Sequence, residues 1–199
     1  MQLIIFVKAP RPGLVKTRLA ATLGPAAACE AYCLLVETLL RGLSSLEEVE
    51  LRFAPDEAAG EILRWRRNSW RMAPQGAGGL GQRLERAFRE AFDRGAGRVA
   101  VIGSDCPAVT QADVASARSA LTAHDVVLGP ANDGGYWLIG LRKPHPELFR
   151  GIAWSTNRVL AETLDCCAAA GLQVELLRSL ADVDTEADWH GFCTGQGRA

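Results

Sequence analysis

The stretch Arg98–Pro107, with the sequence RVAVIGSDCP, decides the predicted fold of this chain. Residues 99–102 are a continuous run of apolar β-formers, which is typical of a strand buried on both faces of a parallel sheet. The run ends in a tight loop that carries Asp105 between Gly103 and Pro107. Because open α/β sheets bind ligands outside the carboxyl ends of their strands, Asp105 is a candidate site residue. The alternative interpretation is that Asp105 only caps the turn or the next helix.

Strands and helices alternate along the rest of the chain. Besides 99–102, the predicted strands are 2–7, 49–54, 70–73, 125–128, 136–141 and 173–177. The predicted helices are 16–43 with a break at Gly24-Pro25, then 57–67, 82–94, 110–123, 156–170 and a last one after Thr185. Ser155 and Thr185 are expected to cap the last two helices. This alternation predicts an α/β protein, a three-layer α/β/α sandwich with a mainly parallel sheet. Without a linker or a repeat, residues 1–199 are expected to be a single domain.

The composition is that of a soluble globular protein. Hydrophobic residues make up 48% of the 199 residues, charged residues make up 23%, and the net charge is −1. A nearly neutral chain does not favour nucleic acid or an anionic membrane as a partner. The six cysteines follow no disulfide or zinc spacing. We therefore expect free thiols and a cytoplasmic location.

The loop after the first strand is rich in cations. It carries Lys8, Arg11, Lys16 and Arg18 and leads into a predicted helix. Such a loop suits phosphate, because backbone N–H groups add to the charge of the side chains. It is not a Walker A loop, since Val15 stands where glycine would precede Lys-Thr, and no GxGxxG motif is present. The alternative is a solvated basic loop.

Two further loops carry carboxylates. Asp133 is followed by the pair Gly134 and Gly135, which allows a backbone to approach a ligand closely. Asp182 and Asp184 point the same way if their segment is extended. Oxygen ligands in ones and twos, with phosphate supplying the rest, are how Mg²⁺ is held. The alternatives are an ordinary turn at 133–135 and helix capping by Asp184 or Thr185. A glycine-rich loop at 75–81 is expected to be flexible.

The motifs of these loops run in order over nearly the whole chain. They are FVKAPRPGLVKTRL (6–19), LGQR (80–83), GSDCP (103–107), GPANDGGYWLIGL (129–141), FRGIAWS (149–155) and DVDTEAD (182–188). Together they resemble the DUF2064 family, whose members are glycosyltransferase-like. The resemblance implies the GT-A, or nucleotide-diphospho-sugar transferase, fold, with a nucleotide over the ends of the central strands. The first loop is also similar to that of phospholactate guanylyltransferases, which share the fold.

The resemblance implies a set of site residues and a cofactor. Those expected to bind the nucleotide are Lys8, Pro10, Gly13, Lys16, Arg18, Arg83 and Asp105, and of these Lys16, Arg18 and Asp105 are expected to act in catalysis. Mg²⁺ or Mn²⁺ is expected on Asp105 and Asp184, with Asp182 as the alternative to Asp184. The residues expected to bind the acceptor are Asp133, Gly134, Gly135, Tyr136 and Trp154.

Three functions fit these residues. The first is a metal-dependent glycosyltransferase that uses a nucleotide-activated sugar and a small-molecule acceptor. The second is a nucleotidyltransferase that joins a nucleoside triphosphate to a phosphorylated acceptor and releases pyrophosphate. The third is a non-catalytic nucleotide sensor, which would bind nucleotide with metal but without turnover. The family description favours glycosyl transfer, whereas the many cations of the first loop favour a triphosphate substrate.

Overall fold

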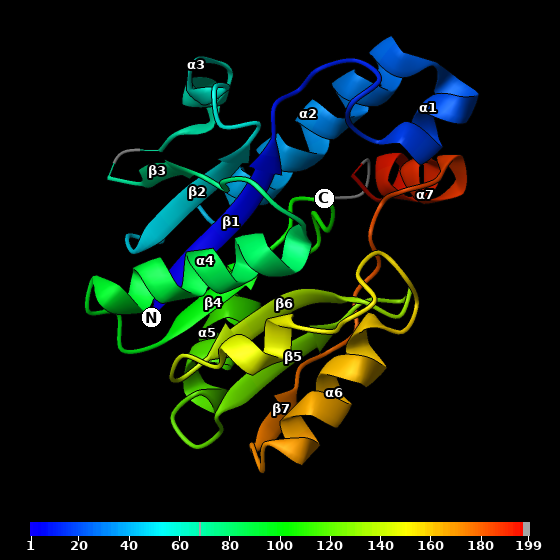
Figure 1. The fold of residues 1–199 in the computed structure, drawn as a ribbon. Coiled ribbons are helices and arrows are strands. Elements are labelled where there is room, and N and C mark those ends of the chain that lie inside the picture. Colours follow the sequence, from blue (N-terminus) through cyan, green and yellow to red (C-terminus); the bar gives the residue numbers. More distant parts are fainter. Residues whose placement is uncertain (68, 197–199) are drawn as a thin grey trace.

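Seven strands form one sheet in the order β3-β2-β1-β4-β6-β5-β7 (Figure 1). This arrangement is seen in a computed structural model that describes residues 1–67 and 69–196. The strands are β1 (Gln2–Lys8), β2 (Val49–Ala54), β3 (Arg71–Pro74), β4 (Val99–Ile102), β5 (Val126–Pro130), β6 (Tyr136–Leu141) and β7 (Val174–Leu176). The predicted strand 99–102 is therefore confirmed as β4, and it lies in the middle of the sheet.

The sheet is mainly parallel, as the alternation of elements predicts. β1 pairs in parallel with β2 and with β4, so these strands end at the same edge of the sheet. Among these seven strands, β6 alone runs antiparallel to its neighbours β4 and β5. The physical reason is the short connection at 131–135, because a parallel crossover needs a dozen or more residues.

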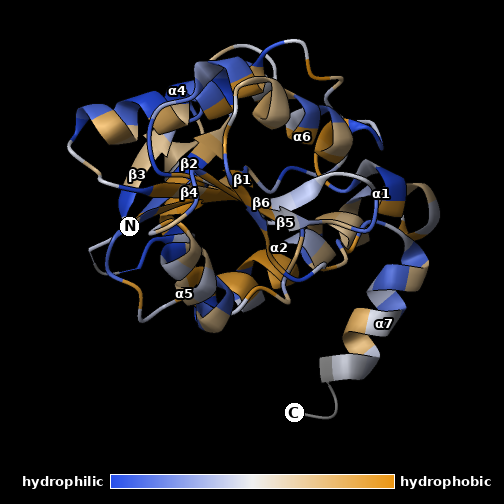
Figure 2. Ribbon diagram, turned by 90° about the horizontal axis from the view of Figure 1, so that it is seen from below, coloured by the Kyte–Doolittle hydropathy of each residue, from blue (hydrophilic) through white to orange (hydrophobic). Residues whose placement is uncertain are grey.

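Helices cover both faces of the sheet. They are α1 (Thr17–Leu23), α2 (Pro25–Gly42), α3 (Ala59–Ile62), η1 (Leu63–Trp65), α4 (Leu80–Asp93), α5 (Gln111–Ala120), η2 (Pro146–Phe149), α6 (Val159–Ala169) and α7 (Glu186–Gln196). Figure 2 shows α4 and α6 on one face and α2 and α5 on the other. The three-layer α/β/α sandwich is thus confirmed.

Each face of the sheet has its own hydrophobic core. In β1, alternate residues point to opposite faces: Leu3 and Ile5 pack into the core under α2, and Ile4 packs with Phe88 of α4 on the other face. Leu3, Ile4 and Ile5 are at most 2% exposed. A strand buried on both faces reads as a continuous apolar run. The two cores therefore fix where the loops after β1 and β4 lie.

The structure confirms one of the two late helix caps and corrects the other. The Thr185 hydroxyl accepts a hydrogen bond from the Asp188 backbone N–H at the start of α7. The prediction for Ser155 is wrong, because α6 begins at Val159. Ser155 instead has a left-handed backbone, with φ of 65°, in the turn before the helix.

The six cysteines are all free, as their spacing predicts. Between residues 1 and 196, with residue 68 left aside, no helix has the length and apolar character that a membrane crossing requires.

Candidate functional site

Three segments meet at the edge of the sheet where β1, β4 and β5 end. They are the loop after β1 (9–16), the loop after β4 (103–110) and the segment 177–185 that returns from β7. The Val183 N–H donates to the Asp105 carbonyl oxygen at 3.0 Å, and the Asn132 N–H donates to the Leu180 carbonyl oxygen at 3.1 Å. These backbone hydrogen bonds bring the carboxylates of the returning segment to the loop after the central strand.

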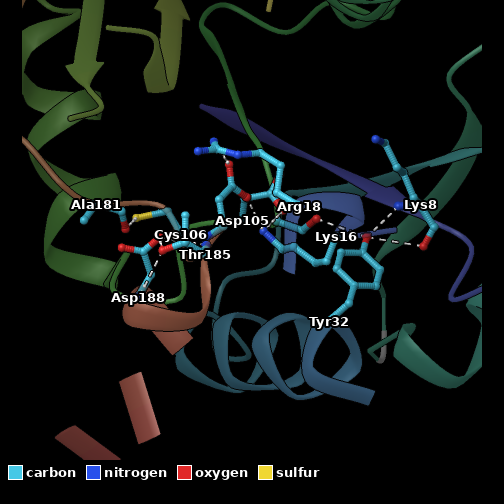
Figure 3. Close-up of polar contacts among 11 residues, drawn as sticks. Lys8, Lys16, Arg18, Tyr32, Asp105, Cys106, Ala181, Thr185 and Asp188 are labelled. Carbon is cyan, nitrogen blue, oxygen red and sulfur yellow. Dashed lines mark hydrogen bonds and ion pairs between the residues drawn. The ribbon is translucent and has the colours of Figure 1, made fainter. Parts of the chain in front are cut away.

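Lys16 joins the two predicted metal ligands. Its ammonium contacts Oδ1 of Asp105 and lies 2.9 Å from Oδ1 of Asp184, although 168 residues separate it from Asp184 (Figure 3). The Lys16 side chain is only 3% exposed. Burial disfavours its charge, but the two carboxylates outweigh this cost, so the pKa of Lys16 lies above its ordinary value. The convergence of Asp105 and Asp184 on one cation is therefore a feature of the structure.

The other two predicted phosphate ligands are more exposed. Arg18 is 68% exposed, and its Nη1 lies 3.6 Å from Oδ2 of Asp184. The Lys8 side chain extends beyond Tyr32, apart from the group formed by Lys16, Arg18 and Asp105 (Figure 3). The helix that follows the loop, α1, begins at Thr17 and has only seven residues. The positive charge of the first loop therefore comes from the side chains of Lys8, Lys16 and Arg18, which lie at separate positions along one edge of the sheet.

A buried tyrosine holds the first loop against the second. The Tyr32 hydroxyl accepts a hydrogen bond of 2.7 Å from the Lys8 N–H and lies 3.2 Å from the Ser104 hydroxyl. Tyr32 is 2% exposed, and burial raises the pKa of its phenol. Neither Tyr32 nor Ser104 was predicted as a site residue. A tyrosine at helical spacing in a helix is typical of a core position. The signal available was the serine directly before Asp105.

Asp182 lies in the same acidic group as Asp184. Burial and the neighbouring charges of Asp105, Asp133 and Asp184 raise the pKa of Asp182 to about 7. It also lines a cavity of about 360 Å³ between α2, α7 and the loop after β4. Lys16 hydrogen-bonds Asp184 and not Asp182. This geometry favours Asp184 over Asp182 as the partner of Asp105.

Side-chain hydrogen bonds join the glycine-rich loop after β3 to the sheet, and its flexibility stays a prediction. The buried Gln75 amide donates to the carbonyl oxygens of Val7 and Arg52, where β1 and β2 end. Arg83 donates to the Gly78 carbonyl oxygen at 2.8 Å and to Oε1 of Gln75 at 3.3 Å. Arg83 thus shapes this loop, whereas its predicted contact with a nucleotide stays a prediction.

The turn at 131–135 is built by packing. Oδ1 of Asp133 accepts a hydrogen bond from the Gly135 N–H at 2.9 Å. Gly134 has φ of 88°, and a Cβ atom there would overlap the backbone of Asn157. The chain itself therefore requires glycine at position 134, and the expected contact of Gly134 with an acceptor stays a prediction. The Asp133 carboxylate lies near enough to raise the pKa of Asp182.

Tyr136 and Trp154 contact each other. Their rings meet edge to face with centroids 6.4 Å apart, and Trp154 also packs on Gly81 of α4. The Tyr136 hydroxyl is buried, and burial raises its pKa. Tyr136 thus has a packing role, and its predicted contact with an acceptor stays a prediction. Trp154 is half-buried and fixes the start of α4 against the loop before α6.

The oxygen donors of this site fit a hard divalent cation. Among residues 1–67 and 69–196, no group of three or more His, Cys, Asp or Glu side chains is arranged to hold a metal. In proteins that bind phosphorylated ligands, Mg²⁺ is usually bound by one or two carboxylates together with ligand phosphates and water. Asp105 and Asp184 supply two carboxylates at one point. The remaining coordination positions of a metal would be filled by a phosphorylated ligand and water. The donor set thus suits a metal that is shared with a phosphorylated ligand.

Comparison with known proteins agrees with this fold. The model of the DUF2064 family, described as an uncharacterized protein conserved in bacteria, matches residues 40–156. A candidate nucleotide-diphospho-sugar transferase from Desulfovibrio desulfuricans G20 is 36% identical, with 93% of this chain and 84% of that chain covered and a TM-score of 0.86. None of the curated proteins compared with the chain matches it.

Two more distant structures share the fold alone. CMP:2-keto-3-deoxy-manno-octonic acid synthetase complexed with CTP is 12% identical, with 99% of this chain and 98% of that chain covered and a TM-score of 0.61. A manganese complex of Rv0371C from Mycobacterium tuberculosis H37Rv is 14% identical, with 96% and 97% covered and a TM-score of 0.54. The sheet and its loops are therefore those of the nucleotide-diphospho-sugar transferase fold.

Proposed function

The chain belongs to the DUF2064 family, and from that premise we propose that it is a divalent-metal-dependent transferase that uses a nucleotide-activated donor. The observation that supports this best is the position of Lys16 between Asp105 and Asp184, with Arg18 beside them. Cations and carboxylates at one edge of the sheet form a site for a metal and a phosphate chain together.

Each residue of this edge has a proposed role. Lys8, Lys16 and Arg18 bind the phosphate oxygens of the nucleotide, and the backbone at Pro10 and Gly13 shapes the loop that carries them. Arg83 holds the glycine-rich loop through its hydrogen bonds to Gly78 and Gln75, and this loop is proposed to border the bound nucleotide. Asp105 and Asp184 would hold Mg²⁺ or Mn²⁺. The metal supplies neutralisation of the charge that develops on the phosphates.

Glycosyl transfer is the form of the reaction that we place first. The relative at 36% identity is described as a candidate nucleotide-diphospho-sugar transferase, and the match covers most of this chain. In this reaction the bond between the anomeric carbon and the phosphate oxygen breaks, and a bond from an acceptor oxygen to that carbon forms. The nucleoside diphosphate leaves, and the acceptor loses a proton. The acceptor is proposed to enter beside Asp133 and Trp154.

Nucleotidyl transfer is the second candidate. The cations Lys8, Lys16 and Arg18 match the larger charge of a triphosphate, and a fold relative binds CTP. Here a phosphate oxygen of the acceptor attacks the α-phosphorus, and the bond to the β-phosphate breaks, so that pyrophosphate leaves.

Ligand binding and product release test the proposal. A panel of nucleoside triphosphates and nucleotide sugars is screened with Mg²⁺ or Mn²⁺ by thermal unfolding. A ligand at about 100 times its Kd is expected to raise Tm by about 5–10 °C. The stabilising nucleotide is then incubated with sugar and sugar-phosphate acceptors. Nucleoside diphosphate as product supports glycosyl transfer, and pyrophosphate supports nucleotidyl transfer. Stabilisation without any product would indicate a sensor, and no stabilisation by any nucleotide would contradict the proposal.

A further inference from the structure

The buried ammonium of Lys16 contacts one oxygen of each carboxylate that is proposed to hold the metal. It contacts Oδ1 of Asp105 and Oδ1 of Asp184, and its side chain is 3% exposed (Figure 3). The other cation near this pair, Arg18, reaches only Oδ2 of Asp184, at 3.6 Å. Lys16 therefore supplies the main positive charge that keeps the two carboxylates together.

An ammonium and a divalent cation cannot share this position. Mg²⁺ binds carboxylate oxygens at about 2.0–2.1 Å and requires near-ideal octahedral geometry. The Lys16 ammonium already occupies the space between the two Oδ1 atoms, so a metal that bound both oxygens would meet its nitrogen. Two positive ions at that separation would also repel each other. Lys16 and a metal therefore exclude each other from the space between these two Oδ1 atoms.

We propose that Lys16 holds the metal position closed until a nucleotide phosphate chain draws its ammonium away, so that the divalent cation binds together with the nucleotide and not before it. This inference rests on the proposed function. The phosphates offer Lys16 new anionic partners, and the flexible four-carbon stem of lysine lets the ammonium move from carboxylates to phosphates. By linkage, the metal must then strengthen nucleotide binding by the same factor by which the nucleotide strengthens metal binding.

The charge of the site explains why the Lys16 ammonium must move before the metal binds. With Lys16 in place, one of the two negative charges of Asp105 and Asp184 is balanced and both Oδ1 atoms are engaged, so a free metal gains less there. When Lys16 turns to the phosphates, the two carboxylates are left without their main counter-ion and favour a divalent cation. Lys16 is therefore a residue that determines when the metal binds, in addition to being a phosphate ligand.

The test measures Mn²⁺ binding to the whole protein without any nucleotide, by calorimetry and by the loss of the free Mn²⁺ signal in electron paramagnetic resonance. Lys16→Met is expected to bind Mn²⁺ about tenfold or more tightly than the wild type, within the usual range of coupling between two ligands. Lys143→Met removes one exposed lysine far along the chain from this site, and it is expected to bind Mn²⁺ as the wild type does. Lys16→Met combined with Asp184→Asn should lose the gain.

A second variant covers the case in which Lys16→Met does not fold. Lys16→Gln keeps a hydrogen-bond donor for the two carboxylates while it removes the charge, and it is expected to show the same direction of change. Equal Mn²⁺ affinity of the wild type and of the folded Lys16 variants, whether weak or tight, would overturn the inference.

The outcomes separate this inference from the proposed function. If nucleotides stabilise the wild type but the Lys16 variants gain no Mn²⁺ affinity, only the inference fails. If the variants gain Mn²⁺ affinity but no nucleotide stabilises the wild type, the proposed function fails, and the part of the inference that assigns metal entry to the nucleotide fails with it.

Discussion

The Tyr32 hydroxyl lies 3.2 Å from the Ser104 hydroxyl and accepts a hydrogen bond of 2.7 Å from the Lys8 backbone N–H. Tyr32 comes from α2, Lys8 ends β1, and Ser104 directly precedes Asp105 in the loop after β4. One buried side chain thus fixes the loop of the proposed phosphate ligands relative to the loop of the proposed metal ligand. A site that must hold a phosphate chain and a metal at once depends on this distance.

Tyr32→Phe is expected to weaken both the fold and the site. It leaves the Lys8 N–H without its acceptor, and an unsatisfied buried donor costs about 1–3 kcal/mol. Tm should fall by about 2–10 °C, and nucleotide binding should weaken further than this loss of stability explains. The matched control is Tyr136→Phe, which removes a buried hydroxyl on the other face of the sheet. Equal effects of the two substitutions on nucleotide binding would contradict the positioning role of Tyr32.

Gly134→Ala is expected to destabilise the protein, because the space for a Cβ atom is taken by the backbone of Asn157. The left-handed backbone alone, with φ of 88°, costs about 1–2 kcal/mol for a residue with a Cβ. The control is Gly151→Ala, where φ is 72° but no atom lies within 4 Å of the position that a Cβ would take. Chemical denaturation should show a larger loss of unfolding free energy for Gly134→Ala than for Gly151→Ala. A similar loss for both would mean that backbone strain alone matters at Gly134.

The fold could be predicted to a large extent because its signals are local. The apolar run at 99–102 is a buried strand, and the pairs Gly24-Pro25 and Thr185-Asp188 mark helix ends where they are expected. The residues that sequence patterns misplace are those with distant partners. Glu50 and Arg52 look like an exposed polar face of β2, yet both are buried, because Arg94 and Glu90 of the α4 region pair with them.

The candidate site could be predicted only in part for the same reason. Asp105, Asp133, Asp182 and Asp184 follow strands or precede a helix, so their convergence at one edge follows from topology. The sequence does not show which cation meets them. Lys16 reaches Asp184 across 168 residues because the Val183 N–H is hydrogen-bonded to the Asp105 carbonyl oxygen. Such a contact exists only once the sheet has formed, and no local pattern encodes it.

Asp113→Asn is expected to lower stability at neutral pH and to reduce the acid sensitivity of the fold. Arg178 donates to the Asp113 carboxylate at 2.6 and 2.8 Å, and together with the Thr110 N–H it holds the pKa of Asp113 below its ordinary value. A depressed pKa contributes stability that is complete above the unfolded value of about 3.9 and is lost as the pH falls through the folded value.

At pH 7 the variant should lose about 1.5–3 kcal/mol, the usual contribution of hydrogen bonds to a charged group. The difference from the wild type should shrink as the pH falls below about 4, because the wild-type carboxylate then takes up its proton. Urea denaturation at several pH values measures this. Asp165→Asn, on the exposed face of α6, is the control and should change little. A difference between Asp113→Asn and the wild type that does not vary with pH would contradict the ion pair as its source.

Arg18→Lys is expected to weaken nucleotide binding although it keeps the charge. A guanidinium can bind two phosphate oxygens side by side, whereas an ammonium acts as a point charge. The lost charge-assisted hydrogen bonds correspond to about 1.5–3 kcal/mol, or about ten- to a hundredfold in Kd. Titration with a nucleoside triphosphate, its diphosphate and its monophosphate should show a loss that grows with the number of phosphates.

The control for Arg18→Lys is Arg11→Lys on the same loop. Arg11 is already paired with Glu61 at 2.7 Å and with Glu57 at 3.3 Å, whereas Arg18 is 68% exposed and has one distant carboxylate partner, Asp184. Arg11→Lys should therefore leave the affinities for all three nucleotides nearly unchanged. If both variants lose affinity equally, or if the loss with Arg18→Lys is the same for all three nucleotides, the loop is a basic surface and the phosphates bind elsewhere.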